Sequence, residues 1–313
     1  MSRSKLSIAL ALSAVYLFWG ATYLAMKFAI QTIPPYLMAG TRFMIAGSIL
    51  FAWELLRGAR PPQLTHWKSA AGVGALLLLG GNGGVVWGEQ TVPSGIAAVI
   101  VATVPLWMAA ITWLRPGGKR PSLLVTCGLL LGFSGIVLLV KDSITRDTGT
   151  GNWLGYAVII SAALSWSLGS ILSRDAKVPA SPLMAIALQN LTGGLFCVLA
   201  GLLLGESANV HLDLISARSL LAFIYLIFFG SIIGFSAYIW LLSVADPTVV
   251  STYAYVNPVI AVFLGWALAG EKLTLNDGLA AVVIISSVVM ITLANSRKKS
   301  VTRLSKAGKP TAS

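Results

Sequence analysis

Charged side chains are scarce in this sequence. Asp, Glu, Lys and Arg account for only 10% of the 313 residues, whereas hydrophobic residues account for 57% and the mean hydropathy is +0.84. A soluble domain carries about 25% charged residues, and a surface exposed to water cannot be built from so few charges. The composition therefore excludes a soluble protein and predicts an integral membrane protein.

Cysteine and histidine are also scarce, with two residues of each. Cys127 and Cys197 lie inside separate apolar runs and no CxxC motif is present, so we expect neither a disulfide framework nor a zinc site. His66 and His211 fall in loops on opposite sides, and the acidic residues are scattered at the ends of apolar runs, which disfavours an enzyme. No GxxxxGK[ST] motif is present, so the chain encodes no ATP-driven pump. We predict no cofactor and no bound metal.

The basic residues are unevenly distributed. Lys and Arg number 22 against 10 Asp and Glu, which gives a formal charge of +12. We expect no nucleic acid partner, because no basic and aromatic motif of a nucleic-acid-binding fold is present. With a cytoplasmic N-terminus, 16 of the Lys and Arg residues fall on the inner side and 4 on the outer side. This bias predicts that both termini are cytoplasmic.

Ten apolar runs approach the length of about 20 residues that a bilayer-spanning helix needs. They lie at about residues 7–30, 36–57, 68–88, 93–114, 122–140, 153–173, 182–204, 218–243, 247–270 and 277–294. The first run is too long for the core of a cleaved signal peptide, so we predict that it is a retained helix. The predicted fold is all-α and integral to the membrane, with ten transmembrane helices.

The two halves of the chain are weakly similar. Residues 17–20 read LFWG and residues 164–167 read LSWS, and each half has a stretch with two prolines, at about 92–105 and 245–258. Because five spans is an odd number, a second copy enters the membrane from the opposite side, as in many secondary transporters. We predict inverted five-helix repeats at 7–140 and 153–294 and a basic cytoplasmic tail at 295–313. Chance similarity between apolar segments is the alternative.

Two prolines lie deep inside corresponding predicted helices. Pro105 and Pro258 are about 12 and 11 residues from the helix starts, which is close to the bilayer midplane at 1.5 Å per residue. A proline inside a helix leaves the carbonyl four residues earlier, here Val101 and Ala254, without its usual N–H partner. Lipid cannot replace that partner, so we predict two helix breaks whose carbonyls face a central cavity. A simple packing kink is the alternative.

Aromatic and amide side chains gather at the same predicted depth. Trp and Tyr normally favour the membrane interfaces, and a buried indole N–H or amide needs a polar partner. We predict that a substrate binds among Trp19, Tyr23, Asn82, Trp107, Trp166, Tyr238, Tyr253, Tyr255 and Asn257. For each of these residues, packing between helices is the alternative.

Three ionisable residues lie near the outer ends of predicted spans. We predict that Lys27, Arg42 and Glu89 gate the cavity, with an Arg42–Glu89 ion pair that closes it from outside. The alternative is that the long side chains extend to the membrane interface. No Asp or Glu lies near the midplane, where the proton relays of pumps are usually found. This favours a facilitator, or coupling through groups at the cavity edge.

The chain resembles the EamA-type carriers of the drug/metabolite transporter superfamily. The similar segments are FWGATYLAMK at 18–27, PPYLMAGTRF at 34–43, PSGIAAVIVATVPL at 93–106, TYAYVNPV at 252–259 and GWALAGEKLT at 265–274. The resemblance implies two inverted five-helix repeats around a substrate cavity, in inner-membrane carriers that commonly export amino acids and related metabolites. The family often has a Glu after the fourth helix of each repeat. Glu271 fits this pattern, whereas residues 113–118 of the first half read WLRPGG.

These features together predict a secondary transporter. We expect it to export or exchange a small metabolite, such as an amino acid or a related amphipathic solute, by alternating access. Its expected partners are that metabolite and the lipid bilayer. The alternative is a membrane component with a structural or partner-binding role. Uninterrupted leucine helices or a large soluble domain would favour that alternative, and the sequence contains neither.

Overall fold

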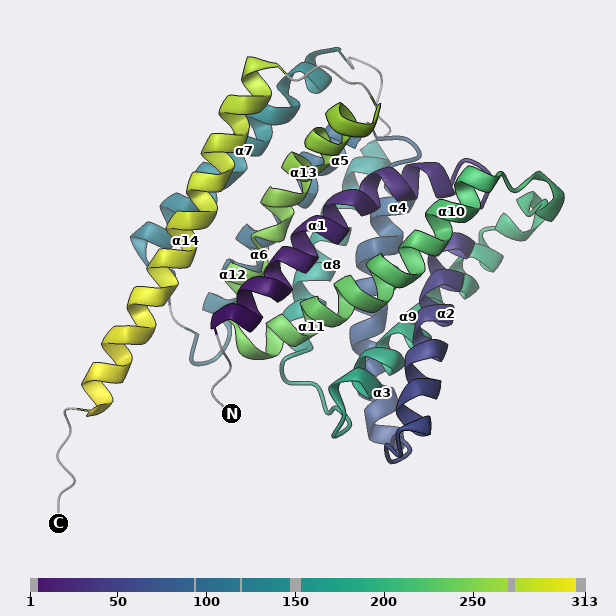
Figure 1. Cartoon of the computed structure of the whole chain (residues 1–313), viewed down its shortest axis with the longest axis horizontal. Helices are drawn as coiled ribbons and strands as arrows, with labels where there is room; N and C mark the ends of the chain where they lie inside the picture. The colour runs from purple at the N-terminus through teal and green to yellow at the C-terminus, as the bar shows by residue number, and fades with distance from the viewer. Residues whose placement is uncertain (1–4, 93, 119, 147–152, 270–273, 308–313) are drawn as a thin grey trace.

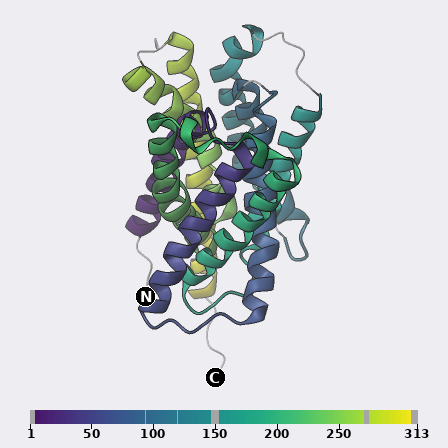
Figure 2. The ribbon, with the colours of Figure 1, turned by 90° about the vertical axis from the view of Figure 1, so that its right-hand side faces the viewer.

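The computed structural model describes residues 5–92, 94–118, 120–146, 153–269 and 274–307, and every regular element in these ranges is helical. The helices form an elongated bundle (Figures 1 and 2). Eight helical segments in these ranges are long and apolar enough to cross a membrane, and two shorter apolar segments lie at Val99–Leu114 and Leu123–Leu139. The prediction of an all-helical, multi-pass membrane protein is confirmed.

Six of the helices are continuous. They are α1 (Lys5–Ala29), α2 (Pro35–Leu56), α7 (Leu123–Arg146), α8 (Trp153–Leu172), α9 (Pro182–Leu203) and α14 (Leu275–Ala307). Proline occupies the first position of α2 and of α9, where its missing N–H costs little. Helix α14 continues through Ala307, so much of the predicted tail is helical. The short 3-10 helices η2 (Glu206–Asn209) and η3 (Leu212–Leu214) follow α9.

Two membrane segments change helix type along their length. The third predicted span consists of α3 (Leu64–Gly74), the π-helix η1 (Ala75–Gly83) and α4 (Gly84–Gly88). The eighth consists of α10 (Ala217–Tyr225), the π-helix η4 (Leu226–Gly234) and α11 (Phe235–Val244). A π-helix is usually a single turn and is frequent at functional sites. Here each half of the chain carries one of nine residues in its third segment.

Two further segments are interrupted. One consists of α5 (Ser94–Val101) and α6 (Val104–Leu114), and the interruption at 102–103 lies just before Pro105. The other consists of α12 (Pro247–Val250) and α13 (Tyr253–Ala269). The predicted break at Pro258 is wrong in position, because Pro258 lies inside α13 and the interruption is at Ser251–Thr252.

Side-chain hydroxyl groups explain the position of this second interruption. Ser251 Oγ donates to the Thr248 carbonyl at 3.0 Å, and Thr252 Oγ1 donates to the Val249 carbonyl at 2.6 Å. Ser and Thr can thereby satisfy carbonyls that would otherwise accept from later N–H groups of a continuous helix. Pro258 removes a single backbone hydrogen bond, and α13 continues through it.

Corresponding helices of the two halves pack against each other. Helix α2 packs along α9, and α7 packs along α14; the second pair lies at one side of the bundle (Figure 1). Helix α1 contacts α13 and the α10–η4–α11 segment, while α8 contacts α6 and the η1–α4 segment. Helices α1, α8, α11 and α13 meet in the centre, where they form the largest buried hydrophobic cluster.

Candidate functional site

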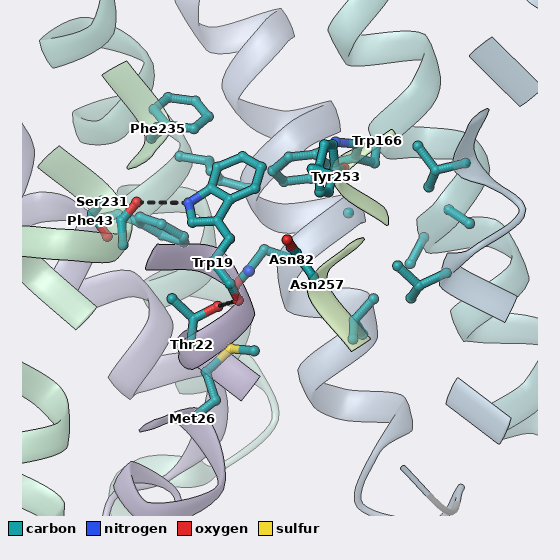
Figure 3. Close-up of a pocket in the computed structure, with 18 of the residues that line it drawn as sticks. Trp19, Thr22, Met26, Phe43, Asn82, Trp166, Ser231, Phe235, Tyr253 and Asn257 are labelled. Atoms are coloured by element: carbon teal, nitrogen blue, oxygen red, sulfur yellow. Dashed lines mark hydrogen bonds between the residues drawn. The ribbon is translucent and has the colours of Figure 1, made fainter. Parts of the chain in front are cut away.

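A cavity of about 100 Å³ lies at the centre of the bundle (Figure 3). A single water molecule needs roughly 10–15 Å³ on the same measure, so several waters or part of a small solute fit. The lining side chains and glycines come from both halves: Trp19, Thr22, Met26, Arg42, Phe43, Leu78, Gly81, Asn82, Val85, Val101, Val104, Ala162, Ala163, Trp166, Gly230, Ser231, Phe235, Tyr253 and Asn257. The lining is mostly apolar with a few polar groups, as in small-molecule sites generally.

Two tryptophans from the similar LFWG and LSWS segments meet beside the cavity. The ring centroids of Trp19 and Trp166 are 5.6 Å apart in an edge-to-face arrangement. Trp19 Nε1 donates to the Gly230 carbonyl of η4 at 3.1 Å, and Trp166 Nε1 donates to Tyr238 Oη at 3.0 Å. Tyr253 packs edge-on against Trp19 and Tyr238, with centroids 5.0 and 5.5 Å away. We call Trp19, Trp166, Tyr238 and Tyr253 the aromatic cluster.

A layer of hydrogen bonds lies beyond the aromatic cluster, toward the end of the bundle where α1 begins. The hydroxyls of Tyr238 and Ser170 are 2.6 Å apart, and both residues are fully buried. The hydroxyls of Tyr16 and Thr252 are also 2.6 Å apart. These contacts join α8 to α11 and α1 to the interruption between α12 and α13. The bundle is therefore closely packed at this end of the cavity.

The two cavity asparagines have different partners. Asn82 Oδ1 accepts a hydrogen bond of 2.7 Å from Arg42 Nη2, which joins η1 to α2. Asn257 is buried, and with its amide group turned so that the nitrogen faces the neighbouring acceptors, it donates to the backbone carbonyls of Tyr253 and Tyr16 at 3.1 and 3.3 Å. Asn82 therefore holds a cation at the cavity wall, whereas Asn257 ties α13 to α1.

Within the described part of the chain, Arg42 is a buried cation without a carboxylate partner. Its side chain is 3% exposed, its guanidinium carbon lies 4.4 Å from the centroid of the Phe43 ring, and its Nε atom has no hydrogen-bond partner. The predicted Arg42–Glu89 ion pair is not formed, because Arg42 bonds to Asn82, about two turns before Glu89 on the same segment. In the described ranges the one ion pair joins Arg115 and Asp175.

Both halves of the chain match one known protein family. The EamA-like transporter family matches at residues 6–141 and again at 153–293. The chain belongs to the EamA-like transporter family. Its relatives include an uncharacterized inner membrane transporter, YedA of Escherichia coli (strain K12). That protein is 40% identical over 284 residues, which cover 90% of each chain.

Two further proteins are similar to this chain at lower identity. The uncharacterized transporter YoaV of Bacillus subtilis (strain 168) is 27% identical over 298 residues, which cover 93% of this chain and 99% of YoaV. A solved crystal structure with 21% identity superposes with a TM-score of 0.75 and covers 94% of this chain and 100% of that one. That structural likeness supports the fold. The names of YedA and YoaV are those of transporters rather than enzymes, and the name of YedA places it in the inner membrane.

Not all predicted site residues of this EamA-like protein reach the cavity. Trp19, Asn82, Trp166, Tyr253 and Asn257 line it, and so does Arg42, which was predicted as a gate. Of the predicted substrate-binding residues, Trp107, Tyr238 and Tyr255 do not line it, and neither does Glu89, which was predicted as a gate. The backbone carbonyls of Val101 and Ala254 were predicted to face the cavity. Val101 lines it, whereas Ala254 is buried in the central hydrophobic cluster.

Helix geometry accounts for the residues that miss the cavity. Tyr253 and Asn257 are four residues apart and share one face of α13. Tyr255 points to the other face, where its hydroxyl donates to the Leu129 carbonyl of α7 at 3.0 Å. Trp107 packs against the central hydrophobic cluster, and Tyr238 is fully buried behind the cavity wall, where its hydroxyl accepts the hydrogen bond from Trp166 Nε1. The side chains of Tyr23 and Lys27 lie outside the described part of the structure.

Several cavity residues were not predicted. They include Thr22, Met26, Phe43, Ser231 and Phe235. Thr22 and Met26 follow Trp19 by three and seven residues, so helical spacing from Trp19 would have identified both. Ser231 and Phe235 lie in and after the π-helix η4, whose altered periodicity the sequence does not reveal.

Gly234 permits the close approach of α1 to the π-helix η4. A Cβ atom at this position would lie 2.7 Å from Trp19 Cδ1 and closer still to Nε1. We expect Gly234→Ala to displace Trp19 and to weaken its bond to the Gly230 carbonyl, at a cost of about 1–3 kcal/mol. The measurement is thermal unfolding of the purified protein. Gly72→Ala is the control, because nothing lies within 4 Å of that site. Equal changes in the two variants would contradict this account.

Glu89 directly follows α4 and is half-buried. Burial raises the pKa of Glu89 from its ordinary 4.5 to about 7. The folded protein thus binds this proton more tightly than the unfolded chain does, so the contribution of Glu89 to stability declines as pH rises from about 4.5 to 7. We expect Glu89→Gln to flatten the fall of thermal stability over this range. Asp213→Asn, at an exposed position of the 3-10 helix η3, serves as control. Identical pH slopes for Glu89→Gln and the wild type would refute the assignment.

Proposed function

We propose that this EamA-like protein is a secondary transporter that moves a small amphipathic metabolite across the membrane by alternating access. The observation that carries the proposal is the central cavity, which is lined by segments from both halves of the chain. Trp19 and Trp166 come from the similar LFWG and LSWS segments and touch each other beside it. A cavity between two halves can open to either side when one half moves against the other.

We also propose that the chain forms ten membrane spans as two inverted repeats, at 7–140 and 153–294. Several observations support this arrangement. The family matches once in each half, and each half has a π-helix in its third segment and an interruption in its fourth. Helix α8 contacts the third and fourth segments of the first half, just as α1 contacts those of the second. An odd number of spans in each half makes the second copy enter from the opposite side.

The positive charges suggest which side of the cavity is closed. With both termini in the cytoplasm, α1 runs outward, and its cavity residues Trp19, Thr22 and Met26 lie in its middle and outer parts. The hydrogen bonds of Tyr16 and Tyr238 then lie on the cytoplasmic side of the cavity. We propose that this layer and the aromatic cluster form the inner gate of the transporter.

The lining of the cavity supports an amphipathic solute. Rings of Trp19, Phe43 and Phe235 offer apolar surface, while Asn82 and Ser231 offer hydrogen bonds. Such a combination suits a metabolite with an apolar part and a polar head, and an amino acid or a related compound is one example. We propose a solute of this class.

Transport assays test the proposal in two steps. Untargeted metabolite profiling of the medium, with and without the protein in the cells, identifies candidate solutes. Uptake of these solutes into proteoliposomes that contain the purified protein then measures transport directly. We expect uptake well above that of empty liposomes. Failure of the folded protein to move any solute that the profiling identifies would overturn the proposal.

Two variants of η4 show whether transport uses the cavity. Ser231 is 1% exposed and lines the cavity, whereas Ile233 is 41% exposed on the outer surface of the bundle. Ser231→Phe fills the cavity and is expected to abolish uptake. Ile233→Phe adds a ring on the same helix and is expected to leave uptake near the wild-type rate.

We propose that transport is not driven by protons. Among the described residues that line the cavity, none is acidic, and central carboxylates are the usual proton relays in pumps. An imposed pH gradient is therefore expected to leave the final level of solute in the vesicles unchanged. Strong accumulation driven by the gradient would refute this part of the proposal, and Glu89 would then be the first residue to replace.

A further inference from the structure

Among the residues that the structure describes, no group that contacts Arg42 balances its charge. The guanidinium lies within the membrane-spanning part of α2, and its described contacts are the Asn82 oxygen and the Phe43 ring. Neither contact carries a negative charge. Burying a cation is costly unless it is paired and fully hydrogen-bonded, yet Nε has no partner. This arrangement leaves the guanidinium able to bind an anion in the cavity.

The other polar groups near Arg42 also lack a matching acceptor. Ser231 Oγ is buried, lines the same cavity and has no hydrogen-bond partner among the described residues. Asn82 uses its oxygen for Arg42, which leaves its NH2 group available as a donor. No Asp or Glu is among the cavity residues that the structure describes. The site is therefore rich in donors and is suited to a ligand that brings acceptors and a negative charge.

We propose that Arg42 binds the carboxylate of the transported solute. The inference rests on the proposed transport function and narrows its substrates to amphipathic monocarboxylates. One guanidinium matches one carboxylate, and the planar fork of arginine pairs well with that group. The apolar part of the solute then lies against the rings of Trp19 and Phe235. An amine without a carboxylate is a poor substrate, because it meets a cation and no acidic partner.

A series of three ligands with the same apolar part tests the charge preference. The probes are 3-phenylpropionate, 3-phenylpropionamide and 3-phenylpropylamine, and their binding is measured with the full-length protein in phosphatidylcholine nanodiscs. We expect the carboxylate to bind at least about tenfold more tightly than the amide, because a hydrogen bond to a charged group is stronger than one to a neutral group. The amine should bind most weakly. Equal binding of carboxylate and amide would overturn the proposal.

Three substitutions show whether Arg42 causes the preference. Arg42→Gln is expected to bind the carboxylate and the amide equally, and to remain at least as thermally stable as the wild type because a buried unpaired charge is gone. Arg57→Gln removes an exposed charge at the end of the same helix and should keep the preference. Asn82→Asp provides an internal counter-ion for Arg42 and should abolish carboxylate binding in a folded protein. An unchanged preference in Arg42→Gln or in Asn82→Asp would refute the role of Arg42.

Two further outcomes distinguish a failure of the carboxylate site from a failure of the proposed transport function. Transport of neutral and anionic solutes at equal rates would defeat the carboxylate site and leave the transport function standing. Binding of the carboxylate through Arg42 without any transport would defeat the transport function and leave the site standing. Displacement of 3-phenylpropionate by phosphatidylglycerol in the nanodisc would assign the site to a lipid headgroup and overturn the assignment to a solute.

Discussion

Replacement of Trp166 by alanine is expected to reduce transport at least tenfold and to lower thermal stability by about 3 kcal/mol. Trp166 forms part of the cavity wall, packs on Trp19 and donates its indole N–H to Tyr238. Loss of the ring removes buried apolar surface and leaves a void, for which losses of about 3–5 kcal/mol are typical of fully buried aromatic residues. Trp166 is half-buried, so we expect the lower end of this range.

Trp153 provides a matched control on the same helix. It is the first residue of α8 and is 76% exposed, so Trp153→Ala removes an equal volume far from the cavity. We expect its transport rate to stay within a factor of two of the wild type. Transport per folded molecule in proteoliposomes and unfolding temperature in detergent are the two measurements. Equal loss of transport in the two alanine variants would contradict the role of Trp166.

Replacement of Glu206 by alanine is expected to destabilise the protein by about 1–2 kcal/mol. Helix α2 begins with Pro34 and Pro35 and has no side-chain cap of its own. Glu206, which follows α9, accepts hydrogen bonds from the backbone N–H groups of Tyr36 and Leu37 at 3.1 and 2.9 Å. The carboxylate thus replaces the missing cap, and its charge is favourable at a helix N-terminus.

The other end of the same helix pair carries a related contact. Glu54 of α2 accepts a hydrogen bond from the hydroxyl of Ser181, the N-cap residue of α9. Each helix of the α2–α9 pair is therefore held at its start by a glutamate from the end of its neighbour or just beyond it. Loss of Glu206 is expected to loosen the pair at one end only.

Graded substitutions at Glu206 separate capping from charge. Glu206→Gln keeps one acceptor oxygen and should lose less stability than Glu206→Ala, while Asp213→Asn removes an exposed charge from the same connection and should have little effect. Thermal unfolding at low and moderate salt is the measurement. A result in which Glu206→Ala and Asp213→Asn unfold at the same temperature would show that the cap contributes nothing.

The features predicted best from the sequence depend on composition and repetition. Scarce charge and long apolar runs led to the all-helical membrane fold. The similarity of LFWG and LSWS led to Trp19 and Trp166, which meet beside the central cavity. Tyr253 and Asn257 were predicted from their depth in the ninth span, and both line the cavity.

The features that the sequence did not predict depend on local competition between hydrogen bonds. The interruption in the ninth segment follows the hydroxyls of Ser251 and Thr252 rather than Pro258. The π-helices η1 and η4 have no distinct residue pattern and change which side chains face the cavity. Arg42 bonds to Asn82 rather than to Glu89, because α2 packs against η1 and brings these two side chains together.

Accessibility of a single cysteine in the cavity tests the central claim most directly. Ser231 is buried at the cavity wall, and Ser231→Cys adds a thiol of nearly the same size. The two native cysteines, Cys127 and Cys197, are first replaced by alanine. If the two halves expose one central cavity alternately, a membrane-impermeant thiol reagent will label this cysteine from either side of sealed vesicles, and a transported solute will slow both reactions. Labelling from one side only, or from neither, would contradict the account.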